Sequence, residues 1–117
     1  MKENVIKTKS FKFAVLVAQC CHGLLERKEF VLSKQLLRSG TSIGANIREA
    51  SNASSRKDFA YRLTVSLREC DETMYWLELL HACKNIETEQ FALLHGNAKE
   101  LTRILTAIIK TTKESIK

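Results

Sequence analysis

The chain contains no proline and only four glycines in 117 residues. Proline is the strongest breaker of an α-helix, because it lacks the backbone N–H and its ring clashes with the preceding turn. Glycine weakens a helix by about 1 kcal/mol relative to alanine. A chain that nearly lacks both residues is therefore expected to form long helices joined by short turns.

Apolar residues recur at intervals of three and four along four stretches, which is the spacing of one face of a helix. The stretches span residues 10–27, 30–52, 55–84 and 88 onward. Ser10, Ser55 and Thr88 are expected to be N-caps, because their hydroxyls can accept from the free N–H groups of a helix start. Four such helices with short connections predict an all-α fold, an antiparallel up-down-up-down four-helix bundle, with residues 1–117 as one domain.

Two features predict contacts beyond the core of the bundle. Gly40 and Gly44 lie one turn apart and each weakens the helix, so a neighbouring backbone is expected to approach closely there. An alternative interpretation is a break between two shorter helices. The run from Met74 to Leu80 is apolar on nearly every face of the helix. It contains more apolar side chains than one buried stripe can hold. The surplus that predicts a second contact surface consists of Tyr75, Trp76, Leu79 and Leu80.

The formal net charge is +6 and is unevenly distributed along the sequence. Residues 1–57 contain 11 Lys and Arg and 4 Asp and Glu, whereas residues 58–117 contain 8 and 9. A basic first half suggests an anionic partner, nucleic acid first, although a solvated basic surface explains the same excess. Aromatic residues that could stack on bases are few here, and Phe11, Phe13 and Phe30 are expected in the core.

The sequence predicts neither a membrane span nor an exported protein. No run approaches the roughly 18 apolar residues that a transmembrane helix needs. The charged start is not followed by the apolar segment of a signal peptide. Four cysteines without a CxxC pair lie within helical patterns and are expected to be core thiols in a reducing cytoplasm. They are Cys20, Cys21, Cys70 and Cys83.

The sequence carries no recognisable catalytic constellation. Glu78 and His81 have the Glu-x-x-His spacing of di-metal bundles, but such a site needs a second copy of the motif and two further glutamates. A glycine-rich phosphate loop and a Gly-x-Ser-x-Gly elbow are both absent. We therefore expect a protein without a metal, a cofactor or an enzymatic activity.

Four runs in the second and third stretches carry a specific resemblance. They are Leu36–Ala50, Lys57–Phe59, Ser66–Thr73 and Tyr75–Leu80. They resemble the signature of the bacterial four-helix bundle proteins related to the small protein encoded in intervening sequences of 23S ribosomal RNA genes. The sequence departs from that signature at Ala50, where many members have glycine, and at residues 51–55, which many members make glycine-rich.

The resemblance implies an antiparallel four-helix bundle that assembles into a ring-shaped homopentamer. A more distant relative, the basic accessory protein of diversity-generating retroelements, resembles a pentameric barrel that engages reverse transcriptase and nucleic acid. No catalytic residue comes with the resemblance.

Together these observations predict a non-enzymatic, homo-oligomeric protein that contacts RNA or DNA phosphates. The candidate phosphate contacts are Arg38, Arg48, Arg56 and Lys57. Arg56 and Lys57 are expected at a helix N-terminus, whose free N–H groups favour an anion. The candidate oligomer interface consists of Gly40, Gly44, Tyr75, Trp76, Leu79 and Leu80. The alternative is a protein–protein adaptor or structural ring, whose binding would lack the steep salt dependence of phosphate contacts.

Overall fold

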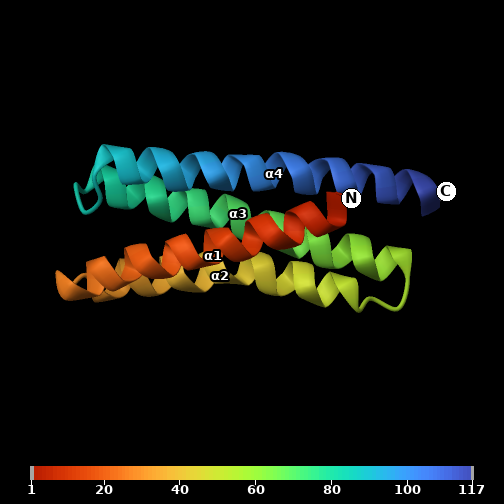
Figure 1. Cartoon of the computed structure of the whole chain (residues 1–117), viewed down its shortest axis with the longest axis horizontal. Helices are drawn as coiled ribbons and strands as arrows, with labels where there is room; N and C mark the ends of the chain where they lie inside the picture. Colours follow the sequence, from red (N-terminus) through yellow and green to blue (C-terminus); the bar gives the residue numbers. More distant parts are fainter. Residues whose placement is uncertain (1, 117) are drawn as a thin grey trace.

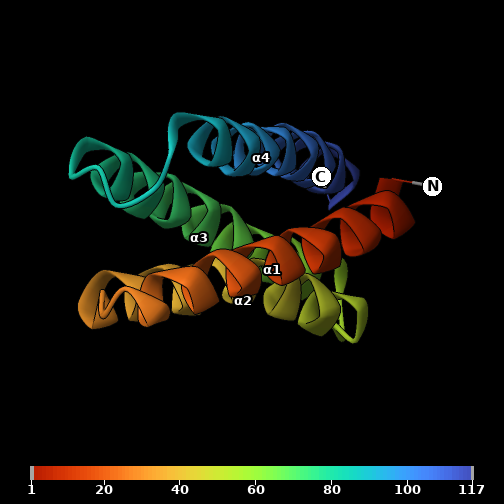
Figure 2. The same cartoon turned by 60° about the vertical axis from the view of Figure 1, so that its left-hand side comes forward.

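The computed structural model describes residues 2–116, which form four α-helices. The helices are α1 (Lys2–Glu26), α2 (Phe30–Ser51), α3 (Arg56–Ala82) and α4 (Thr88–Ile116). Successive helices run in opposite directions, so both chain ends lie at the same end of the rod as the α2–α3 loop (Figure 1). Each helix packs against its neighbours in sequence, and α1 also packs against α4. The turned view in Figure 2 shows α1 lying along α2. The predicted four-helix bundle is confirmed, as a rod of 49 × 21 × 20 Å.

The core runs along the whole rod, because each helix turns one apolar stripe inward. Phe13, Val17 and Leu24 of α1 follow the predicted spacing and are at most 2% exposed. The other helices contribute fully buried side chains in the same way: Leu36 and Ile43 from α2, Leu63, Leu77 and Leu80 from α3, and Leu94, Leu101 and Leu105 from α4. Each such side chain contributes about 1.5–3 kcal/mol through its removal from water. None of the helices between residues 2 and 116 is long and apolar enough to span a membrane.

The α1–α2 and α3–α4 turns close in the same way. Lys28 and Lys84 have φ values of 64° and 62°, the left-handed conformation that ends many helices. The N–H groups that follow, of Glu29 and Asn85, reach back to carbonyls of the preceding helix at 2.9 and 2.8 Å. These bonds satisfy carbonyl groups that a helix end would otherwise leave free.

The predicted helix starts are right at α3 and wrong at α1. Ser55 caps α3, since its Oγ accepts from the N–H of Asp58 at 3.0 Å. By contrast, α1 begins at Lys2, so Ser10 lies inside the helix. Its side chain is buried and donates to the carbonyl of Lys7 at 3.1 Å. Ser10 is therefore a small buried residue in a helix–helix contact rather than an N-cap.

Gly40 packs directly against the Val17 side chain of α1. A Cβ placed on Gly40 would lie 2.8 Å from Cγ1 of Val17, so no larger residue fits without displacing Val17. At Gly44 a Cβ would lie 3.4 Å from Oγ of Ser10, which is ordinary contact. The helix α2 continues through both glycines, so the alternative of two shorter helices is wrong. The predicted neighbouring backbone is present at Gly44, where it is that of Ser10 in α1 of the same chain, whereas the neighbour of Gly40 is a side chain.

Candidate nucleic-acid interface

The antiparallel arrangement sorts charge along the long axis of the bundle. The helix halves that meet at the end holding both termini comprise residues 3–13, 41–68 and 103–116, here called the basic half (Figure 1). The basic half contains 11 Lys and Arg and 4 Asp and Glu, a formal charge of +7. The acidic half, residues 14–40 and 69–102, contains 6 and 9, a formal charge of −3. The difference in charge is larger between the two halves of the bundle than between the two halves of the sequence. The reason is that the last half of α4 lies at the same end as the first half of α1.

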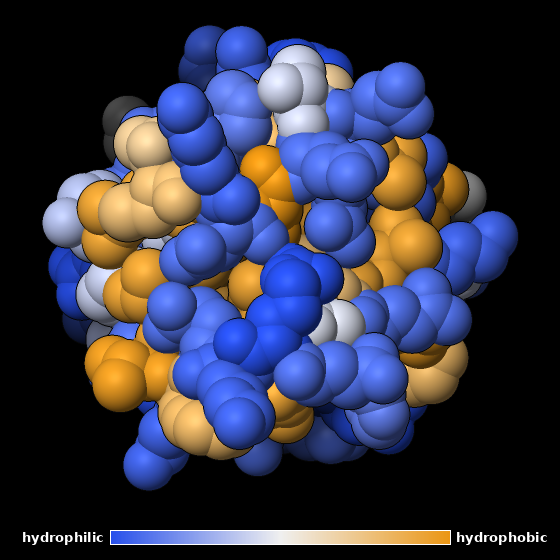
Figure 3. Space-filling model, turned by 90° about the vertical axis from the view of Figure 1, so that its left-hand side faces the viewer, coloured by the Kyte–Doolittle hydropathy of each residue, from blue (hydrophilic) through white to orange (hydrophobic). Residues whose placement is uncertain are grey.

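The acidic half uses polar groups to hold its two turns together. Nη2 of Arg27 donates to the carbonyl of Asn85 at 2.7 Å, and Nδ2 of Asn85 donates to Oε2 of Glu29 at 3.2 Å. These contacts join the α1–α2 turn to the α3–α4 turn. Figure 3 looks onto this end, where hydrophilic side chains cover most of the surface and apolar ones show between them.

Arg38, a predicted phosphate contact, is neutralised within the acidic half. Its guanidinium lies 3.4 Å from Oε1 of Glu69 and also pairs with Glu72, both on α3. The hydrogen bond with Glu72 raises the pKa of Arg38 above its ordinary value. Nε1 of Trp76 donates to the same Glu72 carboxylate at 3.0 Å. A phosphate would have to displace two carboxylates, so Arg38 is no longer a candidate contact.

The other three predicted phosphate contacts lie exposed in the basic half. Nε of Arg56 donates to Oγ of Ser115 at 2.8 Å, a contact that ties the start of α3 to the end of α4. Among residues 3–116, whose side chains the structure describes, Arg48 and Lys57 form no ion pair. Their charges are therefore available to a phosphate.

The anion site predicted at the start of α3 is already filled by the chain itself. The N–H of Asp58 is bound by Ser55, and the N–H of Ser54 lies 3.4 Å from Oδ2 of Asp58. The Asp58 carboxylate thus occupies the position that a phosphate would take at the positive end of the helix dipole. The prediction of an anion site is wrong here, and Arg56 and Lys57 remain candidates through exposure and charge alone.

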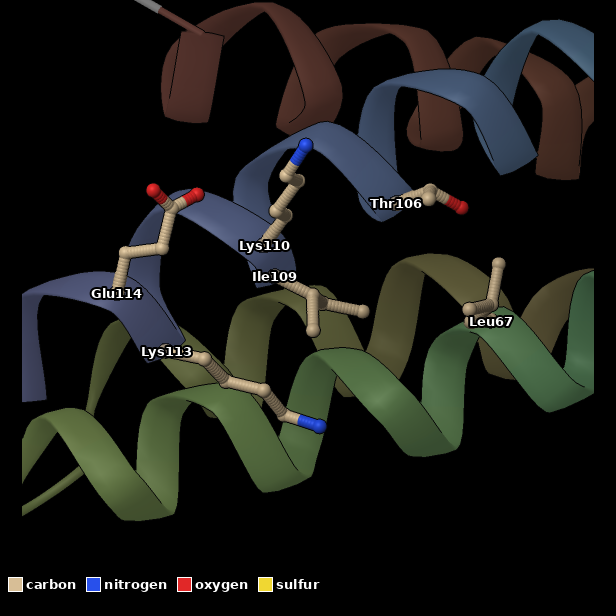
Figure 4. Close-up of a pocket in the computed structure, with 6 residues that line it drawn as sticks. All are labelled: Leu67, Thr106, Ile109, Lys110, Lys113 and Glu114. Carbon is tan, nitrogen blue, oxygen red and sulfur yellow. The ribbon is translucent and has the colours of Figure 1, made fainter. Parts of the chain in front are cut away.

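A groove of about 600 Å³ runs between α3 and α4 in the basic half. Leu67 and Ile109 form its apolar floor, and Lys113 extends across it toward α3 (Figure 4). The adjoining groove toward the chain ends shares Lys113 and is lined by Lys57 and the exposed ring of Tyr61. Both grooves place lysine ammonium groups beside apolar surface.

A second face of the basic half carries a groove of about 610 Å³ between α1 and α2. Lys7 and Phe11 line it from α1, and Thr41, Arg48 and Asn52 line it from α2. The Phe11 side chain is 63% exposed. This groove combines an accessible aromatic ring with cationic side chains.

The aromatic residues of the basic region were expected in the core, and the structure corrects two of the three. Phe13 is 2% exposed, as expected, but Phe11 and Phe30 are 63% and 59% exposed. Residues two apart on a helix point to nearly opposite sides. Phe13 keeps the phase of Val17 and Leu24, so Phe11 has to face outward. The spacing in the sequence already contained this signal.

The predicted oligomer residues separate into an enclosed and an accessible set. Gly40 and Leu80 are enclosed in the core of their own chain and offer no surface to a second copy. Tyr75 is 56% exposed, and Leu79 is partly exposed on the same helix. The partly buried Trp76 packs its ring edge-to-face against Tyr75 at 5.0 Å between centroids. Gly44 is partly exposed in the α1–α2 groove.

Glu78 and His81 of the predicted motif each contact another residue. Nε2 of His95 contacts Oε2 of Glu78 at 2.9 Å, whereas Nε2 of His81 contacts Oγ1 of Thr88 at 3.1 Å. The Phe91 ring lies stacked between the two imidazoles. Across residues 3–116 no three His, Cys, Asp or Glu side chains are placed to hold a metal ion.

Three of the four cysteines are buried, as predicted, and Cys83 is exposed. Burial raises the pKa of Cys21 and Cys70 to about 12, and it also raises the pKa of Cys20. These three thiols stay protonated at neutral pH, and protonated thiols are poor nucleophiles. The buried cysteines are therefore small core residues.

Comparisons with known proteins show a family and solved structures to which the chain is similar. Residues 2–107 match the model of a family described as 23S rRNA-intervening sequence protein. A crystal structure of a protein of unknown function from the S23 ribosomal protein family of Bacteroides thetaiotaomicron is 51% identical, with a TM-score of 0.92. The match covers 94% of this chain and 99% of that chain. No curated protein matches.

Proposed function

The chain belongs to the 23S rRNA-intervening sequence protein family, and we propose that it is a non-enzymatic, homo-oligomeric protein that binds RNA or DNA phosphates through its basic half. The observation that carries this proposal is the charge of +7 gathered on one half of a bundle whose other half is −3. Solubility alone needs net charge but no such separation. Clustered positive charge favours the binding of a polyanion, because each phosphate contact releases a condensed counterion.

The strongest phosphate contacts in this proposal are Arg48, Arg56 and Lys57, together with Lys113 beside Lys57. None of them reads a base edge in a defined geometry, so binding is expected to depend weakly on sequence. The free cysteines are consistent with a reducing cytoplasm, a compartment that also contains nucleic acid.

A homopentamer would repeat the basic half five times. The accessible apolar residues of α3, Tyr75, Trp76 and Leu79, are the proposed contact between copies. They lie in the acidic half, so such a contact leaves the basic half free. Linked weak sites gain affinity through their high effective concentration. Native mass spectrometry tests the assembly: Tyr75→Arg should reduce a complex of five 13.3 kDa chains to smaller species, whereas an unchanged mass would remove α3 from the interface.

The binding experiment is a fluorescence-anisotropy titration of generic RNA and duplex DNA from low to near-physiological salt. Arg48→Glu/Lys57→Glu should weaken binding by about tenfold or more at low salt and flatten the salt dependence, since fewer counterions are released. The matched control is Lys34→Glu/Lys99→Glu, which makes the same charge change in the acidic half and should change affinity less than about twofold. The proposal fails if no nucleic acid binds at low salt, and an adaptor or structural ring is then the better interpretation.

A further inference from the structure

We propose that the α1–α2 groove of the basic half binds single-stranded nucleic acid, with the Phe11 ring as the platform on which an unpaired base stacks. This inference rests on the proposed function and names the form of nucleic acid that the site takes. Phe11 is 63% exposed in the part of the molecule that carries the positive charge. Leaving an aromatic ring in water forgoes the stabilisation that its burial would give.

Cationic side chains surround the ring. Lys7 lies one turn before Phe11 on α1, and Arg48 lines the same groove from α2. In residues 3–116 neither of them has an ion-pair partner, and the same holds for the exposed Lys12 next to Phe11. Proteins that bind single strands combine these two elements, a cationic track for the backbone and aromatic faces for the bases.

The groove exists because small residues meet where α1 and α2 cross. Ser10 and Ala14 of α1 face Gly44 and Ala45 of α2 along the groove. Ser10 turns its hydroxyl to the carbonyl of its own helix, so the side chains between the two helices are short. The larger side chains of Phe11 and Arg48 line the same groove from α1 and α2.

The aromatic platform selects for an unpaired base. In a duplex both faces of each base are covered by neighbouring pairs, so a side chain on the protein surface reaches only phosphates and groove edges. A single strand exposes its base faces, and stacking on one aromatic side chain strengthens binding roughly 5- to 100-fold. The Glu49 carboxylate also lines the groove, so the charges of Lys7 and Arg48 leave its lining with a net charge of +1.

A second copy of this chain is the competing occupant, since Phe11 and the 42%-exposed Val15 lie on the same outer side of α1. That contact would have to cover Lys7, Lys12 and Arg48, which have no carboxylate partner among the described residues. A polyanion neutralises these three charges, and so the observations favour nucleic acid.

Phe30 provides a matched control. Its ring is 59% exposed, nearly as much as that of Phe11, but it lies at the start of α2 in the acidic half. The two rings therefore share chemistry and exposure and differ in the charge around them. Substitution by leucine keeps an apolar side chain and a good helix former at either position.

The experiment compares a labelled 12-nucleotide single-stranded RNA with a duplex of the same sequence, by anisotropy at low salt. Phe11→Leu should weaken binding of the single strand roughly 5- to 100-fold and binding of the duplex less than twofold. Phe30→Leu should leave both unchanged. A 2-aminopurine placed in the single strand should change its fluorescence on binding the unmodified protein and lose that change in Phe11→Leu.

Three results would overturn the inference. If Phe11→Leu binds the single strand within twofold of the unmodified protein, while binding stays salt-dependent, the phosphate-binding function stands and the stacking platform falls. If Phe11→Leu lowers the native mass, Phe11 lies between copies of the chain. If neither RNA nor DNA binds at all, the proposed function fails first. Unchanged circular dichroism and thermal unfolding confirm that each variant is folded.

Discussion

The two ends of the rod are built for different purposes. At the acidic end, the α1–α2 and α3–α4 turns are tied together by Arg27, Asn85 and Glu29, and Ile86 of the second turn is buried. At the basic end, one side-chain hydrogen bond within residues 3–116 joins α3 to the last turn of α4, and it runs from Arg56 to the Ser115 hydroxyl. The turns at the acidic end are anchored by side chains, whereas the α2–α3 turn at the basic end contains no buried residue and lies beside an excess of like charges.

Stability and function depend on different parts of this small bundle. Like charges close together destabilise the compact state, and natural proteins retain such costs where a function needs them. In the acidic half, by contrast, Arg38 is neutralised within the chain by Glu69 and Glu72. Substitutions in the two turns of the acidic end should therefore act on folding, and substitutions of the exposed cations at the basic end should act on binding.

The largest effect on folding is expected at Ile86. This residue lies in the α3–α4 turn but is only 5% exposed and belongs to the core. Ile86→Ala should lower the free energy of unfolding by about 2–4 kcal/mol, through lost burial and the cavity that remains. The control at the opposite end is Ser54→Ala in the exposed α2–α3 turn, expected within about 0.5 kcal/mol. Equal losses in chemical denaturation would contradict the division between the two ends.

A smaller effect is expected at Asn85. Asn85→Ala removes the hydrogen bond to Glu29 but keeps the backbone carbonyl to which Arg27 donates. The free energy of unfolding should fall by about 0.5–1.5 kcal/mol. Ser115→Ala, which removes the partner of Arg56 at the basic end, should have less effect in the same urea titration. A larger loss of unfolding free energy for Ser115→Ala would mean that the hydrogen bond at the basic end stabilises the fold more than the one at the acidic end.

Neutralising charge at the basic end should stabilise the fold. Lys57 and Lys113 line the same groove, so Lys57→Gln/Lys113→Gln relieves repulsion between them. The melting temperature should rise by about 1–3 °C at low salt, and the gain should disappear at high salt, where the charges are screened. The same variant should bind nucleic acid more weakly. Lys34→Gln/Lys99→Gln in the acidic half should give no such rise, and a salt-independent rise would argue against repulsion.

The fold could be predicted from the sequence because helix periodicity is local. Three-and-four spacing and the near absence of helix breakers determine where helices form, and Ser55 shows that a cap can be identified from its neighbours alone. The contacts of a side chain across the bundle are not local. Arg38 reads as a free cation until α3 brings Glu69 and Glu72 against it, and Gly40 reads as a surface feature until Val17 covers it.

The candidate site also depends on contacts across the bundle. The sequence assigned the positive charge to residues 1–57, but the antiparallel packing adds the last half of α4, including Lys113, to that surface. It also placed Phe11 in the core, although the phase of Phe13 and Val17 indicates the opposite. Periodicity identifies the face a residue takes, and only packing identifies what lies opposite that face.

The smallest effect is expected at Glu72, which joins Arg38 to Trp76 in the acidic half. The hydrogen bond from Trp76, helped by Arg38, holds the pKa of Glu72 below its ordinary value of 4.5. A carboxyl group whose pKa is lowered by folding stabilises the protein above its unfolded-state pKa, and this contribution is lost as the pH falls through the lower, folded-state value. Because the side chain is 37% exposed, solvent screening keeps the contribution below about 1 kcal/mol.

Glu72→Gln should therefore lower the free energy of unfolding slightly at pH 7, and the difference from the unmodified protein should close below pH 4. Glutamine can still accept from Trp76, so the experiment isolates the charge. Urea unfolding at the two pH values measures it, and 1 M salt should reduce the difference at pH 7. A loss that stays the same at low pH would mean that Glu72 acts through packing. The charge of Arg38 would then be neutralised by Glu69 alone.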